Sequence, residues 1–236
     1  MKIYKLYILL VLVTASCSKY DTYAPPDARI YGVVNDQITN EPIQTEQPNG
    51  IRIRMIDEKP EYKGVAQPTY FWVKADGTFN NSKVFSGPYD VTPVDGPFYP
   101  LEAGTKIDVM GATQIAFTVE PFLSITAKAT SVKDGVSVTY KLTRGRVGSK
   151  ISEARLLVAS VPYVSTSIFD VIDGANKVAV RNLTAVPDET ILATDYTDEI
   201  KGLLSGKTYF VRIAARTATN INNKYNYSKV MEVKIP

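Results

Sequence analysis

Short runs of alternating apolar and polar residues follow one another from residue 28 to the end of the chain, and this rhythm limits the fold more than any other feature. Residues 50–56 alternate apolar and basic side chains with a period of two, and residues 136–142 place four apolar side chains on one face. Such alternation is typical of β-strands with one buried face. No segment of residues 29–119 requires a helix. The sequence therefore predicts an all-β chain built from short strands.

The length of the chain and its turn residues predict two consecutive β-sandwich domains. Without residues 1–16, 220 of the 236 residues remain, which is long for one β-domain and comfortable for two. The strand rhythm restarts after Pro121, so we place the first domain at residues 28–119 and the second at 120–236. Asp-Gly pairs at residues 76–77, 134–135 and 173–174 indicate hairpin turns within these domains.

The first domain carries three short motifs in a particular order. An I-x-G-x-V motif begins at Ile30, a D-G-x-F motif at Asp76 and an F-x-G-x-Y-x-V motif at Phe85. Together they resemble the carboxypeptidase regulatory-like domain, a small transthyretin-type β-sandwich. The resemblance implies that the last motif supports a tight turn and places the Tyr89 ring against the core. We interpret five residues of these motifs as framework residues, namely Gly32, Gly77, Gly87, Phe79 and Tyr89.

Residues 203–215 form the most specific stretch of the second domain. A leucine pair is followed by a turn with Gly206, then by Tyr209 and an alternating apolar strand. The stretch resembles the corner between the E and F strands of fibronectin type III domains, which belong to the immunoglobulin-like sandwiches. The resemblance implies that Tyr209 is the tyrosine-corner residue, with a buried ring and a hydroxyl bonded to nearby backbone. Residues 227–235 resemble the final strand of that fold.

The amino terminus has the pattern of an export signal. Lys2 and Lys5 precede an apolar run at residues 6–13 that is too short to span a bilayer, and small residues lead up to Cys17. This arrangement resembles the lipobox of bacterial lipoproteins, in which the signal is removed and the cysteine is acylated. The resemblance implies a signal peptide at residues 1–16 and a lipid-anchored tether at 17–27. A secreted soluble protein with a free thiol is the alternative, because Thr14 stands where the family usually has leucine.

The composition excludes several classes of function. The chain has no histidine, which removes the Ser-His-Asp and Cys-His nucleophile systems and the commonest ligand of transition metals. Loss of Lys2 and Lys5 from the 27 basic residues leaves 25 against 24 acidic residues, so we predict no nucleic-acid partner. Residues 170–176 are rich in oxygen but lack the further acidic ligands of a calcium loop. We predict no metal, no cofactor and no catalytic residue.

Two aromatic clusters offer a candidate carbohydrate-binding site. Alternation along residues 69–74 puts Tyr70, Trp72 and Lys74 on one face, and lysine is rarely buried without a partner. We therefore expect the two rings to lie on an accessible surface, where sugar rings can stack on them. Phe98 and Tyr99, in a proline-rich loop, extend this surface if the loop folds alongside it.

Polar neighbours and a competing arrangement complete this prediction. Sugar hydroxyls need hydrogen-bond partners, for which Asn80, Asn81 and Asp95 are the candidates. In the competing arrangement, the second domain packs against the same face and buries Tyr70 and Trp72 as interface residues.

The order of the segments resembles a family of uncharacterised two-domain Bacteroidetes lipoproteins. Their genes typically lie beside starch-utilisation-type outer-membrane transporters and the substrate-binding lipoproteins of those transporters. The resemblance implies a lipid-anchored outer-membrane protein, with the leaflet left open. We expect a non-catalytic accessory to polysaccharide capture. The alternatives are a structural spacer or docking subunit of the transporter complex and, less favoured, a glycosidase with two carboxyl groups about 5 to 10 Å apart.

Overall fold

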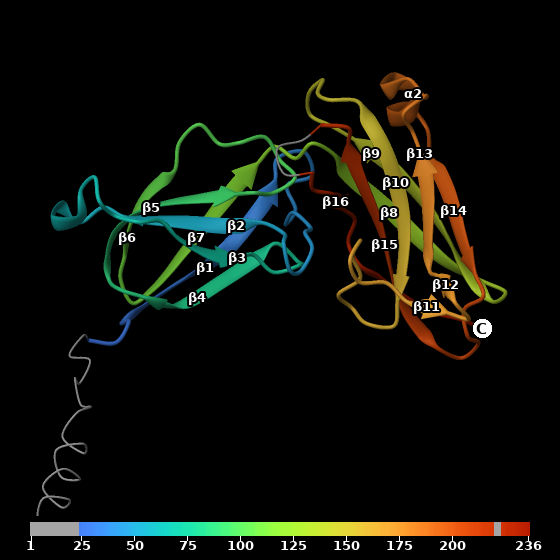
Figure 1. Cartoon of the computed structure of the whole chain (residues 1–236), viewed down its shortest axis with the longest axis horizontal. Helices are drawn as coiled ribbons and strands as arrows, with labels where there is room; N and C mark the ends of the chain where they lie inside the picture. The colour runs from blue at the N-terminus through green and yellow to red at the C-terminus, as the bar shows by residue number, and fades with distance from the viewer. Residues whose placement is uncertain (1–23, 220–222) are drawn as a thin grey trace, which may run out of the picture.

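The computed structural model describes residues 24–219 and 223–236, and β-strands dominate both ranges (Figure 1). The all-β prediction is confirmed. The predicted signal peptide, Cys17 and most of the predicted tether lie outside the described residues. Within those residues, no helix has the length and apolar character needed to cross a membrane.

The first sandwich consists of two sheets whose inner faces share one core. The smaller sheet has the order β4-β1-β7, with β1 parallel to β7, and the larger sheet has the antiparallel order β3-β2-β5-β6. A single 3-10 turn, η1 (Pro60–Tyr62), interrupts the strands. The strands are β1 (Ala28–Asp36), β2 (Arg52–Asp57), β3 (Thr69–Trp72), β4 (Thr78–Val84), β5 (Gly87–Val94), β6 (Thr105–Val109) and β7 (Ala112–Val119).

Gly32 and Tyr89 of the motifs in the first sandwich are framework residues, as the sequence predicts. Gly32 lies against β7 so closely that a Cβ atom there would be 1.7 Å from the Ile115 carbonyl oxygen. Any larger residue would push the two strands apart. The Tyr89 ring is buried, and its hydroxyl donates a hydrogen bond of 2.9 Å to the Phe85 carbonyl.

The Asp76-Gly77 turn forms, but the hairpin predicted around it is wrong. The Lys74 N–H donates to the Thr78 carbonyl at 2.7 Å, which closes the turn. However, β3 pairs with β2 and β4 pairs with β1, so the turn carries the chain from one sheet to the other. Gly77 packs against the loop before β2, where a Cβ atom would lie 2.5 Å from the Ile43 carbonyl oxygen. This tertiary contact, which a local pattern does not reveal, directs the crossing.

The second sandwich also packs two sheets around one core. Its smaller sheet has the order β14-β9-β8, and its larger sheet has the order β13-β10-β15, with β16 and β17 both paired to β15. A short helix, α2 (Asp188–Ala193), which the sequence analysis did not predict, precedes β14. The strands are β8 (Ser124–Val132), β9 (Gly135–Thr143), β10 (Ile151–Ala159), β11 (Val171–Ile172), β12 (Ala175–Asn176), β13 (Val178–Asn182), β14 (Tyr196–Lys201), β15 (Thr208–Thr217), β16 (Asn226–Tyr227) and β17 (Met231–Lys234).

The hairpins and the tyrosine corner predicted for the second sandwich are confirmed, whereas the predicted final strand at residues 227–235 is divided into β16 and β17. β8 and β9 form a hairpin with Val132 opposite Gly135, and β11 and β12 form the hairpin at Asp173-Gly174. Tyr209 is 3% exposed, and its hydroxyl accepts a hydrogen bond of 3.2 Å from the Leu204 N–H. This geometry is that of a tyrosine corner.

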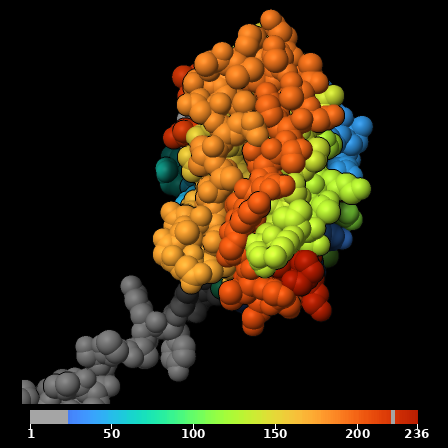
Figure 2. Space-filling view, turned by 90° about the vertical axis from the view of Figure 1, so that its right-hand side faces the viewer, coloured from blue at the N-terminus to red at the C-terminus, as the bar shows by residue number. Residues whose placement is uncertain are grey.

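One end of the first sandwich packs against a face of the second, whose strands run across those of the first (Figure 1), and Arg212 of β15 is buried where they meet. Figure 2 looks along this arrangement, with the second sandwich in front of most of the first. Arg212 is 1% exposed. Its side chain donates to the Thr45 carbonyl of the first sandwich at 2.9 Å and to the Ser228 carbonyl of the second at 2.8 Å. Longer contacts reach the carbonyls of Val164 and Ala75.

Aromatic and acidic neighbours complete the surroundings of this arginine. The Arg212 guanidinium lies 4.5 Å from the centre of the Tyr227 ring, and the Tyr227 hydroxyl donates to the Glu46 carboxylate at 2.8 Å. Burial lowers the pKa of Arg212 to about 10, although Glu46 and Tyr227 oppose that shift. A buried cation with several acceptors is stable only when every bond is made, so the junction favours one relative orientation of the sandwiches.

A second set of polar contacts joins the sandwiches beside Arg212. Ser124 donates to the Asp36 carboxylate at 2.5 Å, and the Asn226 amide donates to the Pro97 carbonyl at 2.9 Å. Lys229 forms an ion pair of 2.9 Å with Glu41. Together with Arg212, these contacts tie the loops of the first sandwich to the start of β8 and to the segment around β16.

Candidate functional site

The edge strand β3 presents Tyr70 and Trp72 on the outer face of the larger sheet of the first sandwich. Each side chain is 44% exposed, whereas Val73 is fully buried and Phe71 packs against the core. The predicted alternation is therefore confirmed. The second sandwich leaves both rings accessible, so the competing arrangement, in which it buries them, is wrong.

Strand pairing places arginine side chains beside these rings. Arg52 of β2 lies opposite Trp72, and Arg54 lies opposite Tyr70. The Arg52 guanidinium carbon is 4.3 Å from the centre of the Tyr70 ring and 5.7 Å from that of Trp72. At these distances the cation is attracted to both rings and holds them beside each other.

Oxygen-bearing side chains fix the arginines on the same face. The Arg52 side chain donates to the Asp95 carboxylate at 2.5 Å. Arg54 donates to the Thr92 hydroxyl at 3.3 Å and lies 3.9 Å from the Asp90 carboxylate. We call this surface the aromatic face, and its members are Tyr70, Trp72, Arg52, Arg54, Asp90, Thr92 and Asp95. Its charges are balanced pair by pair, which suits a neutral, hydroxyl-rich ligand better than a highly charged one.

The structure does not bring Phe98 and Tyr99 to the aromatic face, so the predicted extension is corrected. Phe98 is 3% exposed and belongs to the core of the first sandwich. It fits there because Gly96 has no side chain, since a Cβ atom at Gly96 would lie 2.1 Å from the Phe98 ring. Tyr99 packs edge-on against Phe122, with ring centres 4.8 Å apart.

A cation also covers the Tyr99 ring. The Arg146 guanidinium carbon lies 3.6 Å from its centre, and Arg146 forms an ion pair with Glu120. Tyr99 is therefore a residue of the connection between the sandwiches, and the exposed rings of the aromatic face are Tyr70 and Trp72 alone.

Of the polar residues predicted from the sequence as sugar-binding partners, some lie near the aromatic face and one does not. Asp95 lies on the aromatic face through its bond to Arg52. Asn81 lines a small hollow together with Tyr70, Thr69 and Lys83. Asn80 accepts a hydrogen bond of 2.8 Å from Arg29 on the smaller sheet. Arg52 and Arg54 were not among the site residues predicted from the sequence, although their alternation with apolar residues on β2 indicates that both face outward.

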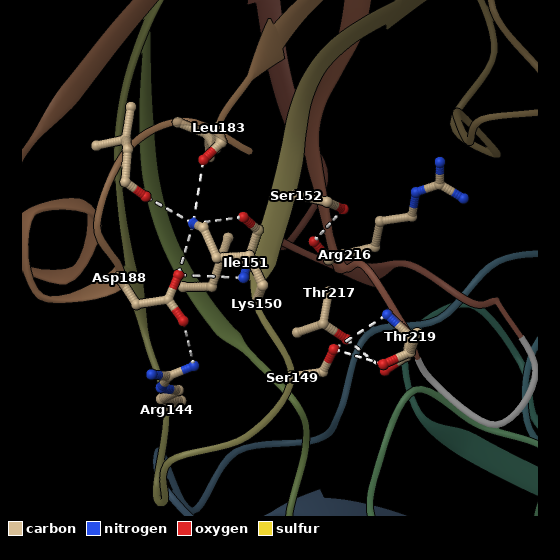
Figure 3. A network of polar contacts seen from close by, with 11 residues as sticks. Arg144, Ser149, Lys150, Ile151, Ser152, Leu183, Asp188, Arg216, Thr217 and Thr219 are labelled. Carbon is tan, nitrogen blue, oxygen red and sulfur yellow. Dashed lines mark hydrogen bonds and ion pairs between the residues drawn. The ribbon is translucent and has the colours of Figure 1, made fainter.

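Lys150 and Asp188 form another polar cluster, at the start of α2 (Figure 3). The Lys150 ammonium group donates to the Leu183 carbonyl at 3.1 Å and to the Asp188 carboxylate at 2.7 Å, and Arg144 donates to the same carboxylate at 3.0 Å. Burial alone would raise the pKa of Asp188, but the hydrogen bonds from Lys150 and from the Ile151 N–H outweigh it and lower that pKa. The donors and acceptors satisfy one another, so this cluster is structural and anchors α2 to β10.

The described residues contain no group of three or more histidine, cysteine, aspartate or glutamate side chains arranged to hold a metal ion. The geometry of the aromatic face favours reversible binding of a ligand. Its two rings offer flat apolar surfaces, and its arginine, threonine and aspartate side chains offer donors and acceptors beside them.

The chain is similar to solved structures from Bacteroides and Parabacteroides species. Residues 28–120 match the family model of the N-terminal domain of DUF3823, a protein of unknown function. A DUF3823 family protein from Bacteroides uniformis has 27% sequence identity and a TM-score of 0.76, with 89% of this chain and all of that chain covered. No curated protein matches the sequence.

Two further solved structures share the two-sandwich fold. One, from Bacteroides uniformis, is described as a candidate carbohydrate binding protein and has 25% identity, with a TM-score of 0.72. The other, a DUF3823 family protein from Parabacteroides merdae, has 17% identity and a TM-score of 0.65. Each alignment covers 89% of this chain and the whole of the related chain. The β-sandwich fold is therefore confirmed, and the lipid anchor and the association with a transporter stay predictions.

Proposed function

We propose that this protein is a non-catalytic, lipid-anchored accessory protein of the outer membrane that binds polysaccharide through the aromatic face. The observation that carries the proposal is the exposure of Tyr70 and Trp72 beside Arg52 on one open sheet surface. Two neighbouring exposed rings bordered by polar side chains form the kind of apolar patch that is typical of interaction sites. The description of a similar protein as a candidate carbohydrate binding protein supports the proposal.

Trp72 provides a direct test because it is the only tryptophan of the chain. Its fluorescence should change, and its quenching by acrylamide should fall, when the purified protein is titrated with soluble starch, xylan, galactomannan or another neutral polysaccharide that it binds. Trp72→Ala should weaken binding of that polysaccharide about tenfold or more, which corresponds to about 1.4 kcal/mol. The free energy of unfolding of Trp72→Ala should differ little from that of the wild-type protein, because the Trp72 ring is 44% exposed.

Tyr62→Ala is the matched control. Tyr62 is 45% exposed and belongs to the same sandwich, but it lies in η1 outside the aromatic face. This substitution should leave binding unchanged. If none of a broad panel of polysaccharides protects Trp72 from quenching, the binding function is rejected.

The lipid anchor has its own test. Several acyl chains on Cys17 would make release from a membrane negligible, because each buried CH₂ adds about 0.8 kcal/mol. Labelled palmitate should be incorporated into the full chain and lost in Cys17→Ala. Labelling that survives the substitution would refute the anchor without affecting the binding function.

The junction favours a second candidate function, that of a rigid spacer or docking subunit for an outer-membrane transporter. The buried Arg212 gives the two sandwiches one relative orientation, as a spacer requires. In that case Trp72 would contact protein, and Trp72→Ala would release the transporter while leaving polysaccharide binding absent. A glycosidase is less favoured, because Asp90 and Asp95 each face an arginine. Hydrolysis of a glycoside by the wild-type protein that is lost in Asp95→Asn would support the glycosidase function.

A further inference from the structure

The aromatic face continues toward the junction along the line of β3. Tyr70, Trp72 and Lys74 follow one another at every second residue, and Lys74 is exposed. At about 3.3 Å per residue, the step from Tyr70 to Lys74 covers roughly 13 Å. Ala75, the next residue, lies at the junction, where its carbonyl contacts Arg212. The row of exposed side chains on β3 and the residues just after it therefore leads to the place where the two sandwiches meet.

A cleft of 660 Å³ opens at that place, between the sandwiches. This volume is in the range typical of sites for small ligands. The first sandwich contributes Gln44, Gln47 and Lys74 to its lining, and the second contributes Tyr163, Lys229 and Val230. Tyr163 stands on the loop after β10 and is 60% exposed, which makes it a third accessible ring near the line of β3.

Arg212 ties together the two segments that line opposite sides of the cleft. The arginine donates to the Thr45 carbonyl, which lies between the two lining glutamines in sequence, and contacts the carbonyl of Val164, the neighbour of Tyr163. Both walls are thus fixed by one buried side chain. A preformed cleft loses little conformational entropy when a ligand binds.

The chemistry of the lining matches that of the aromatic face. Each glutamine donates to a backbone carbonyl of the first sandwich, Gln44 to Pro42 and Gln47 to Val73, so each amide oxygen is left as an acceptor. Lys74 supplies a donor and Tyr163 a flat apolar surface. Donors, acceptors and an exposed ring together are what a sugar unit needs.

We propose that the aromatic face and the cleft form one track, along which a single polysaccharide chain runs from Tyr70 and Trp72 past Lys74 to stack on Tyr163. This inference rests on the proposed function and narrows its ligand. One sugar ring can cover only one of these aromatic side chains, so the track selects an oligosaccharide of several units over a monosaccharide or disaccharide.

The test is a length series of oligosaccharides cut from the polysaccharide that protects Trp72, titrated against the full chain and against Tyr163→Ala. Affinity for the wild-type protein should rise with length beyond the units that Trp72 alone contacts. Tyr163→Ala should bind the shortest active fragment within about twofold of wild type and the longest about tenfold more weakly. The Tyr62→Ala control should follow the wild-type series.

The outcomes separate the two proposals. If no fragment or polysaccharide protects Trp72, the proposed function fails and the track fails with it. If short fragments protect Trp72 but affinity does not rise with length, or if Tyr163→Ala follows the wild-type series, the track is rejected and the aromatic face remains the site. Because Tyr163 is mostly exposed, its substitution should not unfold the protein, which a thermal melt of Tyr163→Ala checks.

Discussion

The two sandwiches use the same pair of residue types on their larger sheets with opposite results. On the first, Arg52 lies beside Tyr70 and Trp72, and its side chain stays about one third exposed. On the second, Arg212 lies beside Tyr227 and is 1% exposed. The difference is in what covers each face, since solvent covers the first and neighbouring loops and the other sandwich cover the second.

The location of the hydrogen-bond partners of each arginine distinguishes a binding surface from a structural junction. Arg52 has a carboxylate partner within its own sandwich, so its position needs nothing from elsewhere in the chain. Arg212 donates to backbone carbonyls of both sandwiches. Its hydrogen bonds are therefore complete only when both sandwiches are folded and in contact. An arginine beside aromatic rings indicates a candidate ligand surface when its partners are local and its rings are exposed.

The largest effect on stability is expected from substituting the buried arginine, Arg212. Arg212→Met should destabilise the protein by about 3 kcal/mol or more, because buried carbonyls lose their donors and Glu46 loses a nearby cation. Urea denaturation, followed by fluorescence and circular dichroism, measures the loss. A change below about 1 kcal/mol would show that the guanidinium does not hold the junction together.

A smaller effect is expected from the ring that Arg212 contacts. Tyr227→Phe removes the hydroxyl that donates to Glu46, and should lose about 1 to 2 kcal/mol at neutral pH. Burial, reinforced by Glu46, raises the pKa of Tyr227 above its ordinary value of 10.0. The neutral phenol is therefore favoured in the folded state, and its contribution is complete below that ordinary value and lost as the pH rises above it.

Urea denaturation of both proteins at a series of alkaline pH values checks this sign. The stability gap between wild type and Tyr227→Phe should narrow as the pH rises past about 10. A gap that stays constant over this range would contradict the assignment.

The smallest effect is expected on the exposed side. Arg52→Met should change the free energy of unfolding by less than about 1 kcal/mol, because its ion pair with Asp95 is accessible to water. It should nevertheless weaken polysaccharide binding, since Tyr70 and Trp72 lose the cation that holds them beside each other. If Arg52→Met destabilises the protein as strongly as Arg212→Met, the distinction between the two faces breaks down.

Local features of the fold could be predicted from the sequence because local rules decide them. Alternation and the expected exposure of Lys74 predicted that Tyr70 and Trp72 face outward, and the resemblance of residues 203–215 to a fibronectin type III corner predicted the role of Tyr209. The predicted exposure of Phe98 was wrong because the orientation of its ring depends on the space that Gly96 leaves in the core. No alternation rule applies in such a loop.

The junction could not be predicted because its partners are far apart in the chain. Arg212 and Thr45 are 167 residues apart, and no periodicity links them. One signal was present, since residues 154–160 are apolar on both faces, and a strand of this kind needs cover on each side. The signal shows that something covers the sheet, but it does not identify Arg212 as the residue that reaches across.

The position of Arg212 late in the chain has a consequence for how the protein is made. Residues 28–119 leave the ribosome long before residue 212, and a domain generally folds as soon as its own strands are complete. During that interval water must hydrate the Thr45 carbonyl, which later accepts a hydrogen bond from Arg212. The newly made first sandwich therefore has an end that stays open until β15 and the segment around β16 are complete, and a chain that stops short of residue 212 would expose that end to other proteins.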